Sequence, residues 1–346
     1  MKILLIRRDN IGDLILTTPL IASLAQAYNA PVDLLVNSYN QAVLHGNPDV
    51  GQLHLYSKLH HRQPGQSALS VLWQRLKTIL ALRRARYDVA IIAREQWDKR
   101  PLQWAKLAGA RRIIALGEQM PAAITDPVSP GREPEHIVQR LARLTAPLGL
   151  PETPPGPLAL YLGDDEIAAM RQRLALKEGL PVYGLQISAR KAPQRWQVEK
   201  FAELARRLVQ QEHCQLLLFW SPGDANNPRH PGDDDKAAEL LAACAGLPIA
   251  PVVTHQLREL MAAMSFCDQI LTSDGGALHV AAGVGVPTVA LFGNSEAHFW
   301  GPWQVPHRVV EGPTRDVRLL SVEAVLEAFN ALRQQVLQQA GVAIPA

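Results

Sequence analysis

One continuous stretch, Cys267–Gly293, constrains the fold more than any other part of the chain. An apolar run that ends at Ser273 is followed by the turn Asp274-Gly275-Gly276, after which small and apolar residues resume. Pro287 then ends a helix, and residues 288–292 have the composition of a buried parallel strand. This order of strand, glycine turn, helix and strand predicts a complete βαβ unit.

The turn of that unit has a chemical use as well as a structural one. At such a junction, backbone N–H groups and the positive end of a helix dipole point to one side, where a phosphate oxygen can bind. An equally simple interpretation is that Asp274 caps the helix and the glycines only turn the chain. The turn alone does not separate the two interpretations.

The same alternation of strands and helices extends over the whole chain. Its strands are apolar throughout rather than apolar at every second residue, which is typical of parallel sheets covered by helices on both faces. Strands are predicted at 2–6, 32–36, 53–56, 87–92, 112–116, 182–187, 215–220, 271–273 and 288–292. Helices are predicted at 14–28, near 41, and at 68–86, 100–108, 135–150, 164–178, 198–211, 236–241, 257–265 and 321–339. Pro19 interrupts the first helical pattern, so that helix could instead start near Thr17 or Thr18.

A length of 346 residues favours two domains. The proline-rich segment 151–157 can sustain neither a helix nor a central strand, and it is the best candidate for the boundary. We therefore predict a first domain at 1–155 and a second at 156–346, with the last helix free to pack back on the first domain. The fold class is α/β, with two Rossmann-like domains that face each other across a cleft.

Charge and cysteine content narrow the possible partners and the compartment. A net charge of +3 suits an anionic substrate or a membrane surface, but it is too small for a nucleic-acid-binding surface. The cysteines are Cys214, Cys244 and Cys267, which form no CxxC motif and fit a reducing cytoplasm. The apolar run 1–6 is far shorter than a membrane helix, so any contact with a membrane is expected to be peripheral.

Three other polar or aromatic groups have structural interpretations. His54, His60 and His61 lack metal-ligand spacing and are expected to be structural or solvated. The acidic run 233–235 precedes a helix and is expected to interact with its dipole rather than with a metal. The aromatic loop 298–303 could cover a ligand or close an edge of the core.

The loops at the carboxyl ends of the predicted strands carry complementary groups. In the second half these are suited to a diphosphate, namely Ser188, Arg190, Lys191, Arg195 and the Asp274-Gly275-Gly276 turn. In the first half, Asp13 offers a carboxylate beside Gly12. A diphosphate leaving group and a general base are what transfer of a group from an activated nucleotide requires.

Two motifs carry a resemblance to a known family. Residues 3–7, 10–13 and 17–20 form the first motif, and residues 274–282 and 287–293 form the second. Together they resemble glycosyltransferase family 9, which contains the ADP-heptose:lipopolysaccharide heptosyltransferases. The resemblance implies a GT-B fold, an inverting and metal-independent transfer, a nucleotide-sugar donor as substrate and no cofactor. It also implies a lipid-linked oligosaccharide acceptor, with the enzyme in the cytoplasm or peripheral on the inner face of the inner membrane.

The resemblance also assigns expected roles to matching residues. Asp13 matches the family's base, and Asn10 and Gly12 beside it are expected to contact the acceptor. In the donor motif, Asp274 is expected to bind sugar hydroxyls, while the other matching residues, Gly275, Gly276 and His279, are expected to contact ribose or phosphate. His279 could instead be satisfied inside its own domain.

The chain departs from the family pattern at three positions. Gly275 stands where members usually have Thr or Ser, so a phosphate-binding hydroxyl is missing. Gln194 stands where many members have Lys, and Gln197 follows Trp196 where they have Pro. Lys191 or Arg195 is the candidate to supply the missing charge.

The leading hypothesis is a heptosyltransferase that uses ADP-heptose and a lipopolysaccharide core acceptor. Three alternatives remain: a related transferase with another nucleotide sugar, a catalytically weak homologue that binds the nucleotide sugar, and a nucleotide-sugar epimerase. Asp13 argues against the weak homologue, and the first-half motif argues against the epimerase.

Overall fold

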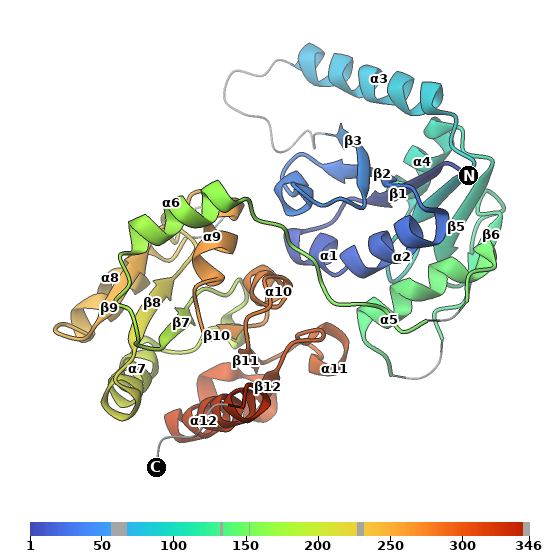
Figure 1. Ribbon diagram of the computed structural model, residues 1–346. Coiled ribbons are helices and arrows are strands. Elements are labelled where there is room, and N and C mark those ends of the chain that lie inside the picture. The colour runs from blue at the N-terminus through green and yellow to red at the C-terminus, as the bar shows by residue number, and fades with distance from the viewer. Residues whose placement is uncertain (57–67, 132–133, 152, 227–231, 342–346) are drawn as a thin grey trace. The chain divides into compact units, whose positions relative to one another are not determined.

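The computed structural model describes residues 1–56, 68–131, 134–151, 153–226 and 232–341. The chain divides into two compact units, Met1–Tyr161 and Leu162–Ala346 (Figure 1). Each unit contains one six-stranded parallel sheet with helices on both faces. The predicted α/β class, with two Rossmann-like units, is therefore confirmed.

The first unit has the strand order β3-β2-β1-β4-β5-β6. In chain order its elements are β1 (Ile3–Arg7), α1 (Ile11–Ile15), α2 (Thr18–Tyr28), β2 (Val32–Asn37), η1 (Gln41–Leu44), β3 (Val50–Tyr56), α3 (Ala68–Ala85), β4 (Val89–Ile92), α4 (Lys99–Ala108), β5 (Arg112–Leu116), β6 (Asp126–Val128), α5 (Ile137–Ala142) and η3 (Arg143–Leu148). Strand β1 is central, with Leu5 paired to Leu34 of β2 and to Ile91 of β4. All residues of β1 are buried, which explains the unbroken apolar run of its first four residues.

Two starts were considered above for the first predicted helix, and the structure has the second of them, near Thr17 or Thr18. Thr17 is the N-cap of α2, and Pro19 lies in the first turn, where its missing N–H costs nothing. Residues 11–15 form the separate short helix α1. The helical pattern at 135–150 is likewise divided, because Pro147 lies inside the 3-10 helix η3 that follows α5.

The second unit has the strand order β12-β11-β10-β7-β8-β9. In chain order its elements are α6 (Asp164–Leu174), β7 (Val182–Gln186), η4 (Ala192–Gln194), α7 (Val198–Glu212), β8 (Gln215–Phe219), α8 (Asp234–Ala243), β9 (Ile249–Val252), α9 (Leu257–Met264), β10 (Gln269–Ser273), α10 (Gly276–Gly283), β11 (Thr288–Phe292), α11 (Ala297–Trp300), β12 (His307–Glu311), η5 (Pro313–Arg315), η6 (Val317–Leu319) and α12 (Val322–Gln339). The predicted βαβ unit is thus β10-α10-β11, with β10 and β11 parallel.

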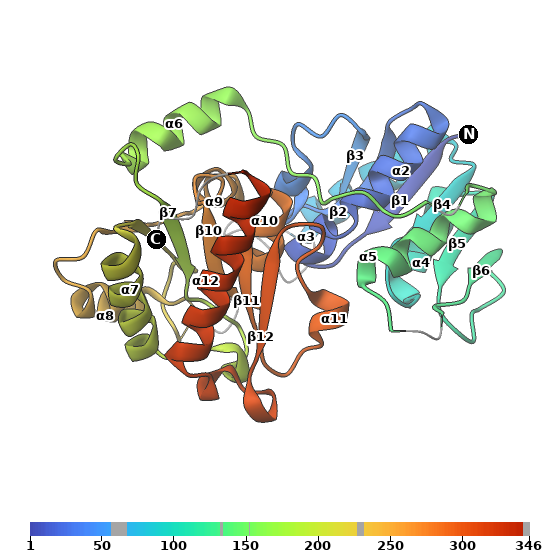
Figure 2. The same cartoon turned by 60° about the horizontal axis from the view of Figure 1, so that its bottom comes forward.

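Helix α12 packs on the second sheet, beside α7 (Figure 2). Its residues Val325 and Phe329 are fully buried in the core formed with β7, β8, β10 and β11. The Gln269 side chain also donates a hydrogen bond of 2.9 Å to the Phe329 carbonyl. The last helix therefore belongs to the second unit, and the option of packing back on the first domain is corrected, because its apolar face completes the core of the second.

The boundary between the units falls after Tyr161, whereas the sequence analysis placed it after residue 155. Part of the extended segment that follows the prolines packs on the first unit. Leu158 is buried there, and the Ala159 amide donates a hydrogen bond of 3.0 Å to Thr18 Oγ1. Proline content indicated a connecting segment but not which unit it packs against.

All three cysteines are unpaired and buried. Burial raises the pKa of Cys214 to about 12. It also raises the pKa of Cys244 and, still more strongly, that of Cys267. Since the thiolate is the reactive form, these thiols are chemically inert in the folded chain.

Candidate functional site

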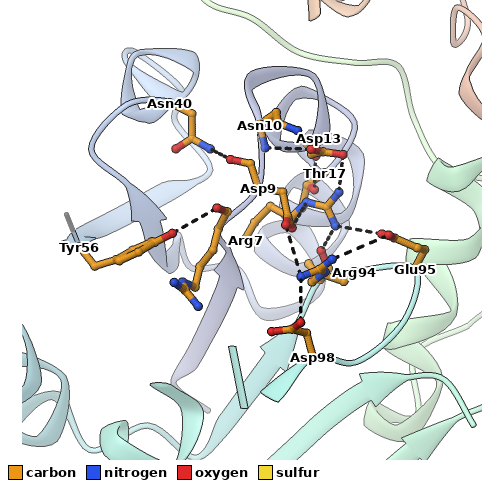
Figure 3. Close-up of polar contacts among 12 residues, drawn as sticks. Arg7, Asp9, Asn10, Asp13, Thr17, Asn40, Tyr56, Arg94, Glu95 and Asp98 are labelled. Carbon is orange, nitrogen blue, oxygen red and sulfur yellow. Dashed lines mark hydrogen bonds and ion pairs between the residues drawn. The ribbon is translucent and has the colours of Figure 1, made fainter. Parts of the chain in front are cut away.

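Asp13 lies in the first turn of α1, just beyond the carboxyl end of β1 (Figure 3). Its Oδ2 accepts a hydrogen bond of 2.8 Å from the Asn10 backbone N–H, and its Oδ1 lies 3.0 Å from Arg7 Nη2. The Thr17 hydroxyl donates to the Asp13 carbonyl at 2.8 Å. The carboxylate is thus held in one orientation, yet the side chain remains 17% exposed and can meet a substrate.

Arg7 is the buried centre of a charge cluster, which we call the Arg7 cluster. Its members are Arg7, Asp9, Asp13, Arg94, Glu95 and Asp98. The Arg7 side chain is completely buried, donates to the Ala93 carbonyl, and lies 3.5 Å from Asp9 and 3.9 Å from Glu95. A buried guanidinium needs such partners, since an unpaired one would be very costly.

The other cation of the cluster is Arg94, which follows β4 and pairs with Asp9 at 3.4 Å and with Asp98 at 3.9 Å. Burial raises the pKa of Asp9, while the charges of Arg7 and Arg94 oppose that rise. Sequence reasoning missed this cluster. The available signal was that β1 ends in Arg7, that Arg94 and Glu95 follow β4 closely, and that these two strands are neighbours in the sheet.

The two predicted acceptor residues lie beside Asp13. Asn10 is exposed and precedes α1, and its backbone N–H is the group that orients the Asp13 carboxylate. Gly12 is buried within α1. Both residues are next to the predicted base. A bound molecule could reach Asn10, whereas Gly12 lies inside the fold.

In the second unit, Asp274 follows β10 and is held by two neutral donors. Gln194 Nε2 lies 2.7 Å from Asp274 Oδ2, and the Ser295 hydroxyl donates to the same oxygen at 2.5 Å. These residues come from the loops after β7, β10 and β11, which are adjacent parallel strands. Gln194 is buried, so the residue that replaces the family's lysine has a defined structural partner.

Burial raises the pKa of Asp274, and the hydrogen bonds from Ser295 and Gln194 and the charge of Lys191 oppose that rise. Lys191 is exposed on the same loop. The loop approaches the end of β11 closely, because a Cβ on Gly293 would lie 2.2 Å from the Pro193 carbonyl oxygen. Only glycine fits at position 293 without moving that loop.

Two predicted donor residues are bound within the protein itself. Arg195 donates to the Ala189 carbonyl at 3.1 Å and pairs with the buried Asp233. The Ser188 hydroxyl accepts a hydrogen bond of 2.8 Å from the Ser221 N–H. Both residues shape the loop after β7. The exposed cations of this loop are Arg190 and Lys191, and the charge of Lys191 is the one that acts on Asp274.

The remaining donor residues lie at the start of α10. Gly275 and Gly276 are exposed where the helix begins, whereas His279 is buried one turn later. The N-terminus of α10 therefore opens next to Asp274, as the βαβ pattern predicted. His279 lies in the interior rather than on the surface, and its predicted contact with ribose or phosphate stays a prediction.

Lys236, on α8, holds the loop after β7 by hydrogen bonds to backbone carbonyls at both ends of that loop. Its ammonium donates to the Ile187 carbonyl at 2.8 Å and to the Trp196 carbonyl at 2.9 Å. Burial is the main reason that the pKa of Lys236 falls to about 8, although Asp233 opposes the shift. No pattern in the sequence indicated this role.

The low pKa of Lys236 predicts a pH-dependent stability. Between about pH 8 and pH 10.5 the unfolded chain keeps a proton that the folded chain has released, so the free energy of unfolding rises with pH in that window. We expect a gain of about 2 kcal/mol from about pH 7 to pH 10 relative to Lys236→Met. Urea unfolding of both proteins measures it, and parallel pH profiles would contradict a buried ammonium.

The other groups singled out in the sequence have structural surroundings wherever the structure describes them. The His54 ring forms a hydrogen bond of 2.8 Å with the Tyr87 hydroxyl in the interior. His60 and His61 lie outside the described residues. Asp234 and Asp235 occupy the first turn of α8, as expected of the acidic run. Within the described part of the chain, no three His, Cys, Asp or Glu side chains are grouped as metal ligands. In the aromatic loop, Trp300 packs on the small core around Phe292, which favours closing a core edge.

Residues 75–321 match the model of glycosyltransferase family 9 (heptosyltransferase), which is more than half of the chain. The chain belongs to glycosyltransferase family 9. It is therefore a glycosyltransferase of the heptosyltransferase type, and the resemblance noted in the sequence is confirmed.

Curated relatives agree with this membership. Lipopolysaccharide heptosyltransferase 3 of Escherichia coli (strain K12) is 27% identical over 299 residues, which cover 84% of this chain and 82% of the relative. Lipopolysaccharide heptosyltransferase 2 of the same strain is 27% identical over 363 residues, covering 97% of this chain and 99% of the relative. The similarity thus extends over both units.

Solved structures support the fold. The glycosyl transferase family 9 protein from Veillonella parvula DSM 2008 has a TM-score of 0.81 at 21% identity, covering 96% of this chain and 97% of that chain. The E. coli ADP-heptose lps heptosyltransferase II has a TM-score of 0.76 at 23% identity, covering 98% and 100%. The predicted GT-B fold is confirmed by these neighbours and by the two parallel sheets.

Among the residues that the structure describes, one helical segment, Ile11–Tyr28, is long and apolar enough to cross a membrane. It comprises α1, α2 and the turn between them, and 61% of it is buried inside the protein. Burial of this kind is what a core helix of the first sheet requires.

Proposed function

We propose that the chain transfers heptose from ADP-heptose to a lipopolysaccharide core acceptor, with inversion and without a metal ion. The observation that carries the proposal is the Asp13 carboxylate, which is oriented by Arg7 and by the Asn10 N–H yet remains open to solvent. The names of the curated relatives support the choice of heptose and of the acceptor class.

In the proposed reaction Asp13 accepts the proton of an acceptor hydroxyl as that oxygen attacks the anomeric carbon of the donor sugar. The new C–O bond forms while the bond from the anomeric carbon to the β-phosphate oxygen breaks, and ADP leaves with the electron pair. Attack opposite to the leaving group inverts the anomeric configuration. The acceptor is a lipid-linked oligosaccharide, which places the enzyme at the cytoplasmic face of the inner membrane.

The second unit is proposed to bind ADP-heptose. Lys191 and the N-terminus of α10 stabilise the charge that develops on the diphosphate, so a metal is not required. Asp274 accepts hydrogen bonds from sugar hydroxyls, while Gln194 and Ser295 hold its carboxylate in place. The neutral Gln194 leaves Lys191 as the cation of this loop that faces the diphosphate.

Calorimetric titration with ADP, UDP and GDP, with and without EDTA, tests the donor site. We expect preferential ADP binding that EDTA does not change. Lys191→Met should weaken it about tenfold, because one charge-assisted contact to phosphate is lost. Asp274→Ala should weaken the binding of ADP-heptose but leave that of ADP nearly unchanged, because Asp274 is proposed to bind the sugar hydroxyls. Arg111→Met serves as the control for loss of a positive charge, because Arg111 is 84% exposed and lies in the first unit.

The outcomes separate the alternatives. Preference for UDP or GDP would indicate a transferase with another donor sugar. The replacement of the family's lysine by the buried Gln194 favours one further candidate, a homologue that binds the nucleotide sugar without transfer. ADP binding combined with no release of ADP from ADP-heptose, in the presence of core oligosaccharide, would support that candidate.

A further inference from the structure

Helix α3 carries an exposed apolar stripe along its described side chains, which we call the α3 stripe. The stripe consists of Leu72 (64% exposed), Trp73 (59%), Leu76 (43%) and Leu80 (44%). Residues spaced by four lie on one face of a helix, so these side chains are neighbours. Half of the large apolar side chains that are exposed in the described chain belong to this one helix. Such clustering marks an interaction surface rather than scattered surface residues.

The opposite face of α3 holds the helix to the first unit. Leu82 is fully buried in the core on that side, and the Thr78 hydroxyl donates to the Leu55 carbonyl at 2.9 Å. The Arg75 guanidinium lies 5.3 Å from the centre of the Trp104 ring. Figure 1 shows α3 along the outside of the first unit, next to β3 and α4. The α3 stripe therefore faces away from the core because the other face is already packed.

The charge on α3 has a single sign. Its sequence contains Arg75, Lys77, Arg83 and Arg84 and no acidic residue. These four positive charges exceed the net charge of +3 of the whole chain. The Lys77 ammonium lies 5.7 Å from the centre of the Trp73 ring, so the cation and the aromatic ring of the stripe share one side of the helix.

We propose that the α3 stripe docks on the surface of a lipid bilayer that contains anionic phospholipid. Leucine and tryptophan on one face with lysine and arginine at its margin is the pattern of an interfacial helix, which lies in the membrane plane. The tryptophan ring and the leucines enter the boundary between headgroups and acyl chains, while Lys77 and Arg84 reach lipid phosphates. The single sign of the charge on α3 matches the negative surface potential of a membrane that contains anionic lipid.

This surface is separate from the sites described above. None of its residues belongs to the Arg7 cluster or to the loops around Asp274. A substitution can therefore abolish membrane docking without abolishing sugar transfer. Transfer can be measured on its own with a water-soluble core oligosaccharide as acceptor, because that acceptor needs no membrane.

Vesicle sedimentation of the full chain tests the proposal. We expect at least tenfold stronger binding to vesicles with about one third phosphatidylglycerol than to pure phosphatidylcholine, and a loss of that difference at high salt. The double variant Leu76→Gln/Leu80→Gln should bind about tenfold less. Leu319→Gln is the matched control, because Leu319 is 57% exposed but lies in the second unit.

Brominated acyl chains provide a second measurement, since they quench only tryptophans that enter the bilayer. Quenching should occur with the natural chain and disappear in Trp73→Leu, while the leucine keeps most of the binding. Equal vesicle binding by Leu76→Gln/Leu80→Gln and the natural chain would overturn the proposal. So would self-association that these substitutions abolish, because the stripe would then be an interface between copies of the chain.

Discussion

Asp13→Asn should lower turnover by about three orders of magnitude while leaving the affinity for ADP within about twofold. A positioned general base contributes about 10² to 10⁴ to a rate, and asparagine cannot take up the acceptor proton at neutral pH. The substitution keeps the size of the side chain and leaves Arg7 paired with Asp9 and Glu95. The loss should therefore appear in kcat, measured as release of ADP, and not in calorimetric binding.

Asp98→Asn is the matched control for this experiment. Asp98 belongs to the same charge cluster, but it is 41% exposed and lies 3.9 Å from Arg94 rather than on Arg7. Its turnover should stay within about twofold of the natural chain. Near-natural turnover of Asp13→Asn would remove Asp13 from the role of base, and an equal loss in both variants would indicate that the cluster matters only as a whole.

Arg7→Met should be the most destabilising single substitution in the first unit, with a loss of about 3–5 kcal/mol in the free energy of unfolding. The Arg7 side chain is fully buried and balances carboxylates at Asp9, Asp13 and Glu95. Without it, these carboxylates remain partly buried and lose their main cation. Arg94→Met removes a cation that is 26% exposed and should cost much less, about 1 kcal/mol.

The pH dependence of Arg7→Met distinguishes lost charge from lost packing. Burial already raises the pKa of Asp9, and Arg7 is the first of the charges that oppose this. Removal of Arg7 raises the pKa of Asp9 in the folded chain further. The protonated carboxyl of Asp9 then stabilises the folded chain at low pH, and this stabilisation is lost as pH rises. The deficit relative to the natural chain should be smaller near pH 5 than near pH 7.5. An equal deficit at both pH values in urea unfolding would point to packing alone.

Central strands could be predicted from sequence, whereas three edge strands could not. The predicted strands around β1 and β10 are buried on both faces, and this condition produces a continuous apolar run. The missed strands β6, β9 and β12 all lie at the edge of a sheet. β6 and β9 contain Pro127 and Pro251, which are tolerated where one side of the strand has no partner. Their half-exposed sequences lack the pattern that identifies a strand.

The candidate site likewise contains residues that could be predicted from sequence and residues that could not. Asp13 and Asp274 could be found because each follows a recognisable strand in a local motif. The partners that orient them come from elsewhere in the chain, as Gln194 does for Asp274 across 80 positions. In the sequence, Gln194 could be interpreted only as the replacement of a lysine. Its hydrogen bond to Asp274 forms because β7 and β10 are adjacent in the sheet. Sheet order, which sequence patterns do not specify, is the missing information.

The inert cysteines give the folded chain a practical property. Cys214, Cys244 and Cys267 are buried and their thiols stay protonated, so maleimide dyes should leave the natural protein unlabelled. A cysteine introduced at an exposed site such as Leu319 would then be the only one to react. A second one at an exposed site of the first unit would complete a dye pair for energy-transfer measurements. Energy transfer between the dyes would then show in solution whether substrates change the distance between the two units, without first deleting any native thiol.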